Sequence, residues 1–207
     1  MANEKTRGKI VDGLIELLAT RGFANIGLAD IARASGVSLG TLRESFDGKG
    51  AMLAEFSHRI DRAVLDGGTP EDGTPRERLF EILMRRFDAL RPYAAALKNL
   101  ARSARRDPAL GLALSCLGVG SQKWMLEAAG IRHGGALGRF AINGAALLYA
   151  NVFRVFLEDE DPGLARTMAA LDRALERGER AMQFLGDFCS VPRRFSQRDR
   201  QPAAESS

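Results

Sequence analysis

The chain is poor in the side chains that bind metals, form disulfides or act as nucleophilic catalysts. Its 207 residues include only two cysteines and two histidines. Cys116 and Cys189 lie within apolar helical patterns, so we expect buried free thiols, which suit a reducing cytosol better than a disulfide framework would. His58 and His133 have no second histidine, cysteine or paired carboxylate at ligand spacing. We therefore expect no metal, no cofactor and, without a Ser/His/Asp or Cys/His arrangement, no enzymatic activity.

Long apolar runs are also missing. A membrane-spanning helix needs about 20 consecutive apolar residues, and the longest candidate, residues 136–157, is interrupted by Arg139, Asn143 and Arg154. The segment MANEKTRGK is charged, and no apolar stretch of the secretory type follows it. With 45% hydrophobic and 27% charged residues, the composition is that of a soluble globular protein, and we expect it in the cytoplasm.

The positive charge is unevenly distributed along the chain. Residues 1–66 contain nine Lys/Arg and nine Asp/Glu, for a net charge of zero, whereas residues 76–132 contain eleven and five, for a net charge of +6. A nucleic-acid-binding module normally carries the excess of positive charge, because neutralising phosphates supplies most of its sequence-independent affinity. This distribution therefore argues against nucleic-acid binding by the N-terminal segment.

Hydrophobic residues recur at helical spacing throughout, and no stretch alternates as a β-strand does. The pattern therefore predicts an all-α protein. The first helix is expected to end near Arg21-Gly22, and the next three to cover 28–34, 38–46 and 49–65. Further helices are expected to open at a capping box from Thr74 to Glu77, at Pro92 and at Pro108, to end at Gly130, and to cover 136–158 and 162–188.

A run of turn-forming residues divides the chain. The sequence DGGTPEDGTP at 66–75 is rich in glycine and proline, which makes it the best module boundary. We expect a helical head at 1–48, a linking helix at 49–66, a second helical domain at 75–190 and a flexible tail at 191–207.

The head has the spacing of a helix-turn-helix. Such a motif needs an apolar inner face, a left-handed turn residue, an apolar side chain that fills the corner and a capped second helix. Here Gly36 supplies the turn, Val37 fills the corner and Ser38 caps the second helix. The apolar inner-face residues are Ile31, Ala32, Leu42 and Phe46. The residues left for solvent or a DNA groove are Leu39, Gly40, Thr41, Arg43, Glu44 and Ser45.

The segment from Lys5 to Leu65 resembles the N-terminal domain of the tetracycline-repressor (TetR) family of transcriptional regulators. The residues that carry the resemblance are Gly22-Phe23, Ala29-Asp30-Ile31-Ala32, Gly36-Val37-Ser38, Gly40-Thr41-Leu42, Phe46, Lys49 and Leu53. The family layout is a three-helix head, a linking fourth helix and an all-α ligand-binding and dimerisation domain, and it also fits the remainder of the chain. The resemblance is specific over about the first third and rests on helix number and length beyond it.

The resemblance implies DNA contacts, and the chain departs from the family at several of them. The expected DNA-facing residues are Gly27, Ser38, Leu39, Gly40, Thr41, Arg43, Glu44, Ser45 and Lys49. Where the family usually has a phosphate-contacting threonine, this chain has Ile26-Gly27, and Arg43 stands in place of a tyrosine. Arginine reaches phosphate or guanine at least as well as tyrosine does. Glu44 adds negative charge to a helix that should approach a polyanion.

The resemblance also implies a ligand-binding and dimerisation domain in the later helices. Large side chains and two polar residues form the expected pocket for a small, mostly apolar ligand: Phe87, Trp124, Met125, Arg139, Phe140, Asn143, Tyr149 and Phe153. An ordinary packed core or a dimer contact is the alternative for these residues. An apolar stripe on the last helix exceeds what one neighbouring helix can bury, and it predicts a homodimer through Leu164, Met168, Leu171, Leu175, Met182 and Leu185.

Together these features predict a ligand-responsive regulator of the TetR type, a repressor that leaves a palindromic double-stranded operator when its ligand binds. The alternative comes from another functional class. A lipid-binding accessory protein of ubiquinone biosynthesis has the same fold and does not read DNA, and the neutral head and altered DNA-facing residues fit that case too. The motifs Gly36-Val37-Ser38 and Gly40-Thr41, with Lys49, favour the regulator, because a lipid carrier has no need of them.

Overall fold

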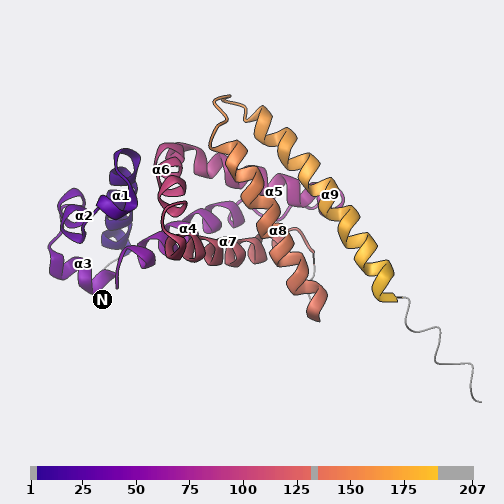
Figure 1. Ribbon diagram of the computed structural model, residues 1–207, viewed down its shortest axis with the longest axis horizontal. Coiled ribbons are helices and arrows are strands. Elements are labelled where there is room, and N and C mark those ends of the chain that lie inside the picture. Colours follow the sequence, from indigo (N-terminus) through magenta and orange to yellow (C-terminus); the bar gives the residue numbers. More distant parts are fainter. Residues whose placement is uncertain (1–3, 132–134, 191–207) are drawn as a thin grey trace, which may run out of the picture.

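The computed structural model describes residues 4–131 and 135–190, and the side chains of all of these except 135–137 and 183–190. Every regular element in these ranges is helical (Figure 1), which confirms the expected all-α class. The α-helices are α1 (Glu4–Thr20), α2 (Leu28–Ala34), α3 (Leu39–Ser45), α4 (Lys49–Leu65), α5 (Pro75–Leu90), α6 (Ala94–Ala104), α7 (Pro108–Ala128), α8 (Gly135–Phe156) and α9 (Ala165–Ser190), with 3₁₀ turns at Phe23–Asn25 and Arg91–Tyr93.

Helices α1, α2 and α3 form a head at one end of the elongated molecule (Figure 1). Ile10 and Leu14 of α1 have no exposed surface, and α2 and α3 pack against this helix. Gly36 has a φ of +67°, the left-handed conformation that the tight turn between α2 and α3 requires. α1 passes so close to this turn that a Cβ at Gly13 would lie 2.4 Å from Ser35 Oγ. The expected helix-turn-helix is therefore present.

Helix α4 connects the head to the rest of the molecule. It packs against α1 in the head and against α5 and α7 beyond it. Its apolar stripe is buried from one end to the other, as its helical spacing predicts: Met52, Leu53, Phe56, Ile60 and Val64. One helix thus contributes to the cores of both parts of the chain.

Helix α6 makes a second connection to the head. Asn99 Nδ2 donates to the carbonyl oxygens of Leu18 (2.9 Å) and Ala19 (3.0 Å), which lie in the last turn of α1. Carbonyls in that turn have no partner within the helix, so Asn99 acts as an external cap. Ser103 Oγ, one turn further along α6, accepts from Phe23 N at 3.0 Å. The end of α1 and the turn after it are therefore hydrogen-bonded to α6.

Helices α5 to α9 form the second domain, in which α8 and α9 lie side by side (Figure 1). Its core includes Phe87, Met125 and Leu171, none of which has exposed surface. The expected capping box opens α5. Glu77 Oε2 accepts from Thr74 N at 2.7 Å, and Thr74 Oγ1 accepts from Glu77 N at 3.2 Å. Two N–H groups that the helix cannot pair are thereby satisfied.

Helix α9 begins at Ala165 rather than at Pro162, where the sequence pattern placed its start. Its first N–H groups are satisfied by two carboxylates of the preceding loop. Asp161 Oδ2 accepts from Ala165 N at 3.1 Å, and Asp159 Oδ2 accepts from Thr167 N at 2.8 Å. Negative charge at a helix N-terminus is also favoured by the helix dipole. The acidic loop therefore caps α9.

The stripe expected at the dimer interface lies largely in the core of the chain itself. Three of its members are buried: Leu164, Leu171 and Leu175. These leucines are covered because α9 packs against α8 and α5, so they are not free for a partner. Met168 and Met182 are exposed, and the side chain of Leu185 lies outside the described residues. Among the α8 side chains that the structure describes, Phe140 and Leu147 are large, apolar and exposed.

The expectation of buried thiols is wrong for Cys116, which is exposed on α7. The side chain of Cys189 and the expected tail at 191–207 lie outside the described residues. Among the helices that the structure describes, none has a stretch that is long and apolar enough to cross a membrane.

Candidate nucleic-acid interface

The second helix of the helix-turn-helix, α3, is held by a cap at its start and by apolar anchors on its inner face. Ser38 Oγ accepts from Thr41 N at 3.0 Å, and the two hydroxyl groups also lie 3.0 Å apart. Leu42 and Phe46 are buried against the head. The opposite face is exposed and consists of Leu39, Gly40, Arg43 and Glu44. The cap agrees with the sequence prediction, and so do four of the six positions expected on the outer face; Thr41 is half-buried and Ser45 is buried.

Arg7 of α1 fixes the other end of α3. Its guanidinium donates to the carbonyl oxygen of Ser45 and to Glu55 Oε2, the latter at 2.7 Å, and its Cζ lies 4.2 Å from the centroid of the Phe46 ring. A cation at a helix C-terminus satisfies a free carbonyl and complements the helix dipole. Arg7 therefore orients the exposed face of α3 and was not among the predicted site residues. The sequence offered no local signal, because its partners lie about 40 and 50 residues away.

Ser45 does not point toward a DNA groove. It is only 6% exposed, and its hydroxyl donates to the carbonyl oxygen of Thr41 at 2.7 Å. The reason is helical geometry: Ser45 follows Leu42 by three residues and therefore lies on the same, inner face. Its assignment as a DNA-facing residue is corrected.

The ammonium group of Lys49 is directed into the head. Lys49 Nζ donates to the carbonyl oxygens of Phe23 (2.7 Å) and Ile26 (2.8 Å) and lies 4.2 Å from the centroid of the Phe23 ring. Burial lowers the pKa of Lys49 from its ordinary value. The side chain thus holds the turn between α1 and α2, a role that differs from the expected phosphate contact.

Arg43 is the exposed cation on α3. Its guanidinium pairs with Asp47 one turn further on, and the two side chains are 71% and 92% exposed. An ion pair this exposed contributes little to stability, about 0–1 kcal/mol, so a phosphate or a base edge can displace Asp47. Glu44 is also exposed.

Ile26 and Gly27 stand at the start of α2, where the resembled family has a threonine. Ile26 is buried, and Gly27 is the exposed residue that precedes α2. The Gly27 N–H donates to Asp30 Oδ2 at 3.0 Å. The Asp30 carboxylate lies 3.5 Å from Arg33 and 4.0 Å from Arg21. Asp30 therefore pairs the Gly27 N–H, but no side chain at Gly27 caps the first turn of α2 as a threonine would.

Part of the acidic charge near the head lies in ion pairs between α1 and α4. Three acidic side chains are used in this way, in the pairs Arg7–Glu55 (2.7 Å), Arg59–Asp12 (2.6 Å) and Arg62–Glu4 (3.2 Å). These three carboxylates therefore neutralise arginines of α1 and α4, and none of them lies on α3. The net charge of the segment is a poor guide to the charge that its α3 face presents to a ligand.

In the second domain, the structure brings together four of the eight expected pocket residues. Tyr149 stacks on Phe87 with ring centroids 5.0 Å apart and lies 6.0 Å from Phe153, and Met125 is buried. Phe156 extends the same aromatic group, 5.1 Å from Phe87. The other four point outward and are corrected as pocket residues: Trp124, Arg139, Phe140 and Asn143. Asn143 Nδ2 donates to the carbonyl oxygen of Arg139 in its own helix.

A buried polar cluster, which the sequence analysis missed, borders these rings. Asp61 of α4 accepts from Arg86 of α5 and, at 2.6 Å, from Ser121 Oγ of α7. The Arg86 guanidinium carbon lies 5.6 Å from the centroid of the Tyr149 ring. A signal was present, because Arg86 stands midway between Ile82 and Leu90 on an apolar helical stripe. Every polar atom in a core needs a partner, because a buried one without a partner costs about 1–3 kcal/mol. Polar clusters are therefore unusual in a core.

The head and its α3 face define a helix-turn-helix protein with an all-helical second domain. Residues 10–56 match the model of the bacterial regulatory proteins of the tetR family. The N-terminal part of the chain is therefore a tetR-family domain.

The solved structures that resemble the chain extend this fold to the second domain. The TetR transcriptional regulator of Nitrosomonas europaea is 23% identical, with a TM-score of 0.67 over 84% of this chain and 98% of that one. A TetR transcriptional regulator from Rhodococcus sp. RHA1 is 20% identical, with a TM-score of 0.59 over 84% and 96%. NalD of Pseudomonas aeruginosa, the secondary repressor of the MexAB-OprM multidrug efflux pump, is 20% identical, with a TM-score of 0.51 over 86% and 97%. No curated protein matches the chain.

Proposed function

We propose that the chain is a transcriptional repressor that binds a palindromic operator as a homodimer in the cytoplasm and releases it when a small, mostly apolar ligand binds. The observation that carries the proposal is the exposed face of α3, with Arg43 at its centre. This seven-residue helix is capped by Ser38 at one end and held by Arg7 at the other. A short helix fixed in this way suits insertion into the major groove, where arginine reads guanine or contacts phosphate.

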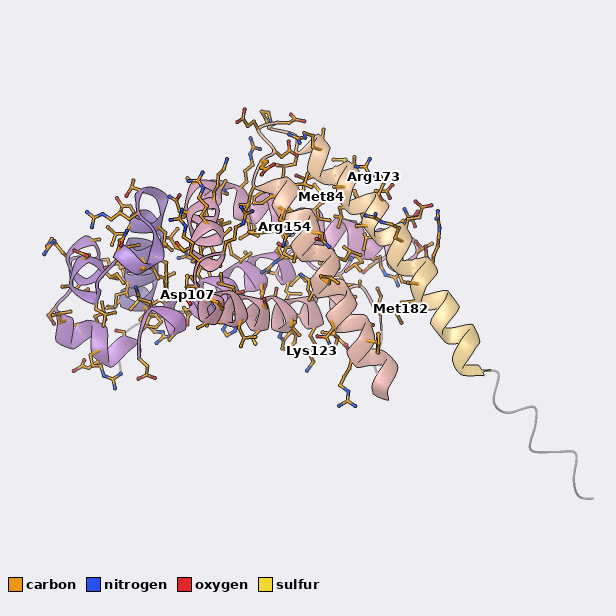
Figure 2. The ribbon with its side chains drawn as sticks, in the orientation of Figure 1. Met84, Asp107, Lys123, Arg154, Arg173 and Met182 are labelled. Carbon is orange, nitrogen blue, oxygen red and sulfur yellow. The ribbon has the colours of Figure 1, made fainter. Side chains whose placement is uncertain are left out.

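The dimer is supported by apolar side chains that the single chain leaves exposed on α8 and α9. These are Phe140 and Leu147 on α8, and Met168 and Met182 on α9, the last of which is labelled in Figure 2. Packing this pair of helices against the same pair of a second chain would cover them in a four-helix interface. A symmetric dimer then presents two α3 helices to half-sites about 34 Å apart, which requires a palindrome.

The ligand response is supported by the two connections between head and second domain. α4 contributes Asp61 to the buried polar cluster and begins four residues after the end of α3. α6 holds the end of α1 through Asn99 and the following turn through Ser103. A ligand that moves either helix therefore moves the head and changes the separation of the two α3 helices.

A lipid-binding protein of the same fold is the alternative. One observation favours it: α3 and the residues just after it carry two exposed carboxylates, Glu44 and Asp47, and the second pairs with Arg43. A lipid carrier has no need of a basic α3 face, whereas negative charge there weakens the approach of DNA.

The proposal is tested by comparing alanine variants of two arginines that are similarly exposed and similarly paired. Arg43 on α3 and Arg180 on α9 are 71% and 69% exposed, and each pairs with a carboxylate one turn away in the chain. Binding to a fluorescent duplex is measured by anisotropy over a range of salt concentrations. Arg43→Ala should weaken binding by about 1–3 kcal/mol, or roughly 5- to 150-fold, whereas Arg180→Ala should leave it nearly unchanged.

Two results of this comparison contradict DNA binding by α3. The first is equal weakening in both variants, which shows only a general effect of net charge. The second is the absence of duplex binding by the unaltered protein at low salt, and co-purifying lipid would then support the carrier.

A further inference from the structure

Two further buried polar side chains lie beside the buried polar cluster of Asp61, Arg86 and Ser121. Gln122 follows Ser121 in the chain, and Arg86 lies over the ring of Tyr149. The Tyr149 hydroxyl has a partner in Arg86, whose hydrogen bond opposes the rise that burial causes in the Tyr149 pKa. Among the described residues, three other polar atoms here have no hydrogen-bond partner: Arg86 Nε and the amide nitrogen and oxygen of Gln122. More than about 90% of buried polar groups in folded proteins have such a partner. These atoms therefore point to a polar group that the chain itself does not supply.

Gln122 lies on a helix that packs against the helices of Arg86 and Tyr149. Gln122 has no exposed surface and lies on the buried face of α7 between Ser121 and Met125. α7 packs against α4, α5 and α8, the helices that carry Asp61, Arg86 and Tyr149 (Figure 1). The ring of Phe87 stacks on that of Tyr149. Polar atoms and aromatic surface therefore occur side by side.

The charges of the cluster restrict the ligand to a neutral group. The Arg86 cation is already balanced by the Asp61 carboxylate, with which it forms a buried ion pair. A charged ligand group would therefore be buried without a counterion, which is strongly unfavourable. Burial raises the pKa of Tyr149, so its hydroxyl is protonated and can donate.

The numbers of donors and acceptors restrict the ligand further. Arg86 Nε and the Gln122 amide nitrogen can donate, while the Gln122 amide oxygen accepts. A matching group needs a strong acceptor and at least one N–H donor, without net charge. A carboxamide has this combination. The neighbouring rings of Phe87, Tyr149 and Phe153 favour an aromatic body.

We infer that the cluster around Gln122 binds the carboxamide of a neutral aromatic amide, whose ring system lies against Phe87 and Tyr149. This inference names the ligand class for the proposed function and rests on its ligand-binding part. Asp61 belongs to α4, so a ligand at Gln122 and Arg86 lies beside the helix that leads to the head.

The test uses three probes of matched size on the full chain without DNA: 2-naphthamide, 2-naphthoate and 2-methylnaphthalene. Binding is measured by equilibrium dialysis. 2-Naphthamide should bind at least about tenfold more tightly than either of the others, because a site with buried polar groups rejects a ligand that leaves them unpaired. Equal binding of the three, tighter binding of 2-naphthoate, or no binding of 2-naphthamide would overturn the inference.

A pair of variants separates recognition from general packing. Gln122→Leu introduces an apolar side chain of similar size and removes both amide atoms, so the preference for 2-naphthamide over 2-methylnaphthalene should be lost or reversed. Leu126→Met, at a buried residue of the same helix, should keep the preference. If Gln122→Leu retains the wild-type preference, Gln122 does not bind the amide and the inference fails.

The effect of 2-naphthamide on duplex binding is measured separately. A protein that prefers the amide but binds DNA equally with and without it supports the site and contradicts the ligand response. A protein that binds DNA through Arg43 without any amide preference supports the DNA-binding proposal and overturns the site.

Discussion

Replacing Asp61 with asparagine should destabilise the protein more than any exposed charge substitution. Asp61 and Arg86 form an ion pair in which the two side chains are only 9% and 7% exposed. Asparagine keeps the shape and an acceptor for Ser121 but removes the negative charge, so Arg86 becomes a buried cation without a counterion. At a separation of about 4 Å and an effective dielectric constant near 20, the lost attraction is about 4 kcal/mol. Loss of one partner of a buried pair costs about 3–5 kcal/mol, in agreement with this value.

Urea unfolding followed by circular dichroism measures the loss in the free energy of unfolding. In thermal unfolding, the expected fall in Tm is roughly 6–20 °C for a chain of this length. Glu176→Gln, which breaks the exposed pair with Arg180, is the control and should cost less than about 1 kcal/mol. The double variant Asp61→Leu/Arg86→Met should recover most of the loss, because both charges are removed together. A loss below about 1 kcal/mol for Asp61→Asn would refute the reasoning.

Three other predictions follow from individual contacts. Leu147→Glu places a charge on the exposed apolar face of α8 and should convert the dimer into a monomer at micromolar concentration in sedimentation velocity; an unchanged dimer would contradict the α8–α9 interface. Asp47→Asn frees Arg43 and removes a charge near α3, so it should tighten duplex binding at low salt by about two- to tenfold; unchanged anisotropy titrations would show that this pair does not face DNA. Hydrogen bonds from the Thr74 N–H and hydroxyl lower the pKa of Glu77. The stabilisation that the ionised Glu77 carboxylate provides is therefore complete above the ordinary glutamate pKa of about 4.3, and it is lost as the pH falls through the lowered pKa. The stability difference between the wild type and Glu77→Gln should therefore shrink from pH 7 to pH 3, and a constant difference would contradict this role.

The helix positions could be predicted because their signals are local. α2 at Leu28–Ala34 and α4 at Lys49–Leu65 have the expected bounds, since apolar spacing and caps lie within the segments themselves. The start of α9 could not be predicted, because it depends on the loop residue Asp159, whose partner Thr167 lies eight residues later in the helix.

The functional residues divide in the same way. The exposed positions of α3 follow from its helical period, and Arg43 is exposed as expected. The role of Lys49 depends on carbonyl groups 23 and 26 residues earlier in the chain, which no helical pattern reveals. Trp124 and Phe140 were expected inside because they are large and apolar, but they are exposed, and an apolar side chain on the surface of one chain can be buried by another.

Binding-site selection with the purified protein tests DNA recognition by α3 most directly. A library of random duplexes is selected at low and at physiological salt, with the wild type and with Arg43→Ala in parallel. The account predicts enrichment of a palindrome with half-sites about one helical turn apart, and loss or relaxation of this sequence in the variant. Failure to enrich any sequence at either salt concentration, or enrichment of the same palindrome by Arg43→Ala, would contradict recognition of an operator through α3.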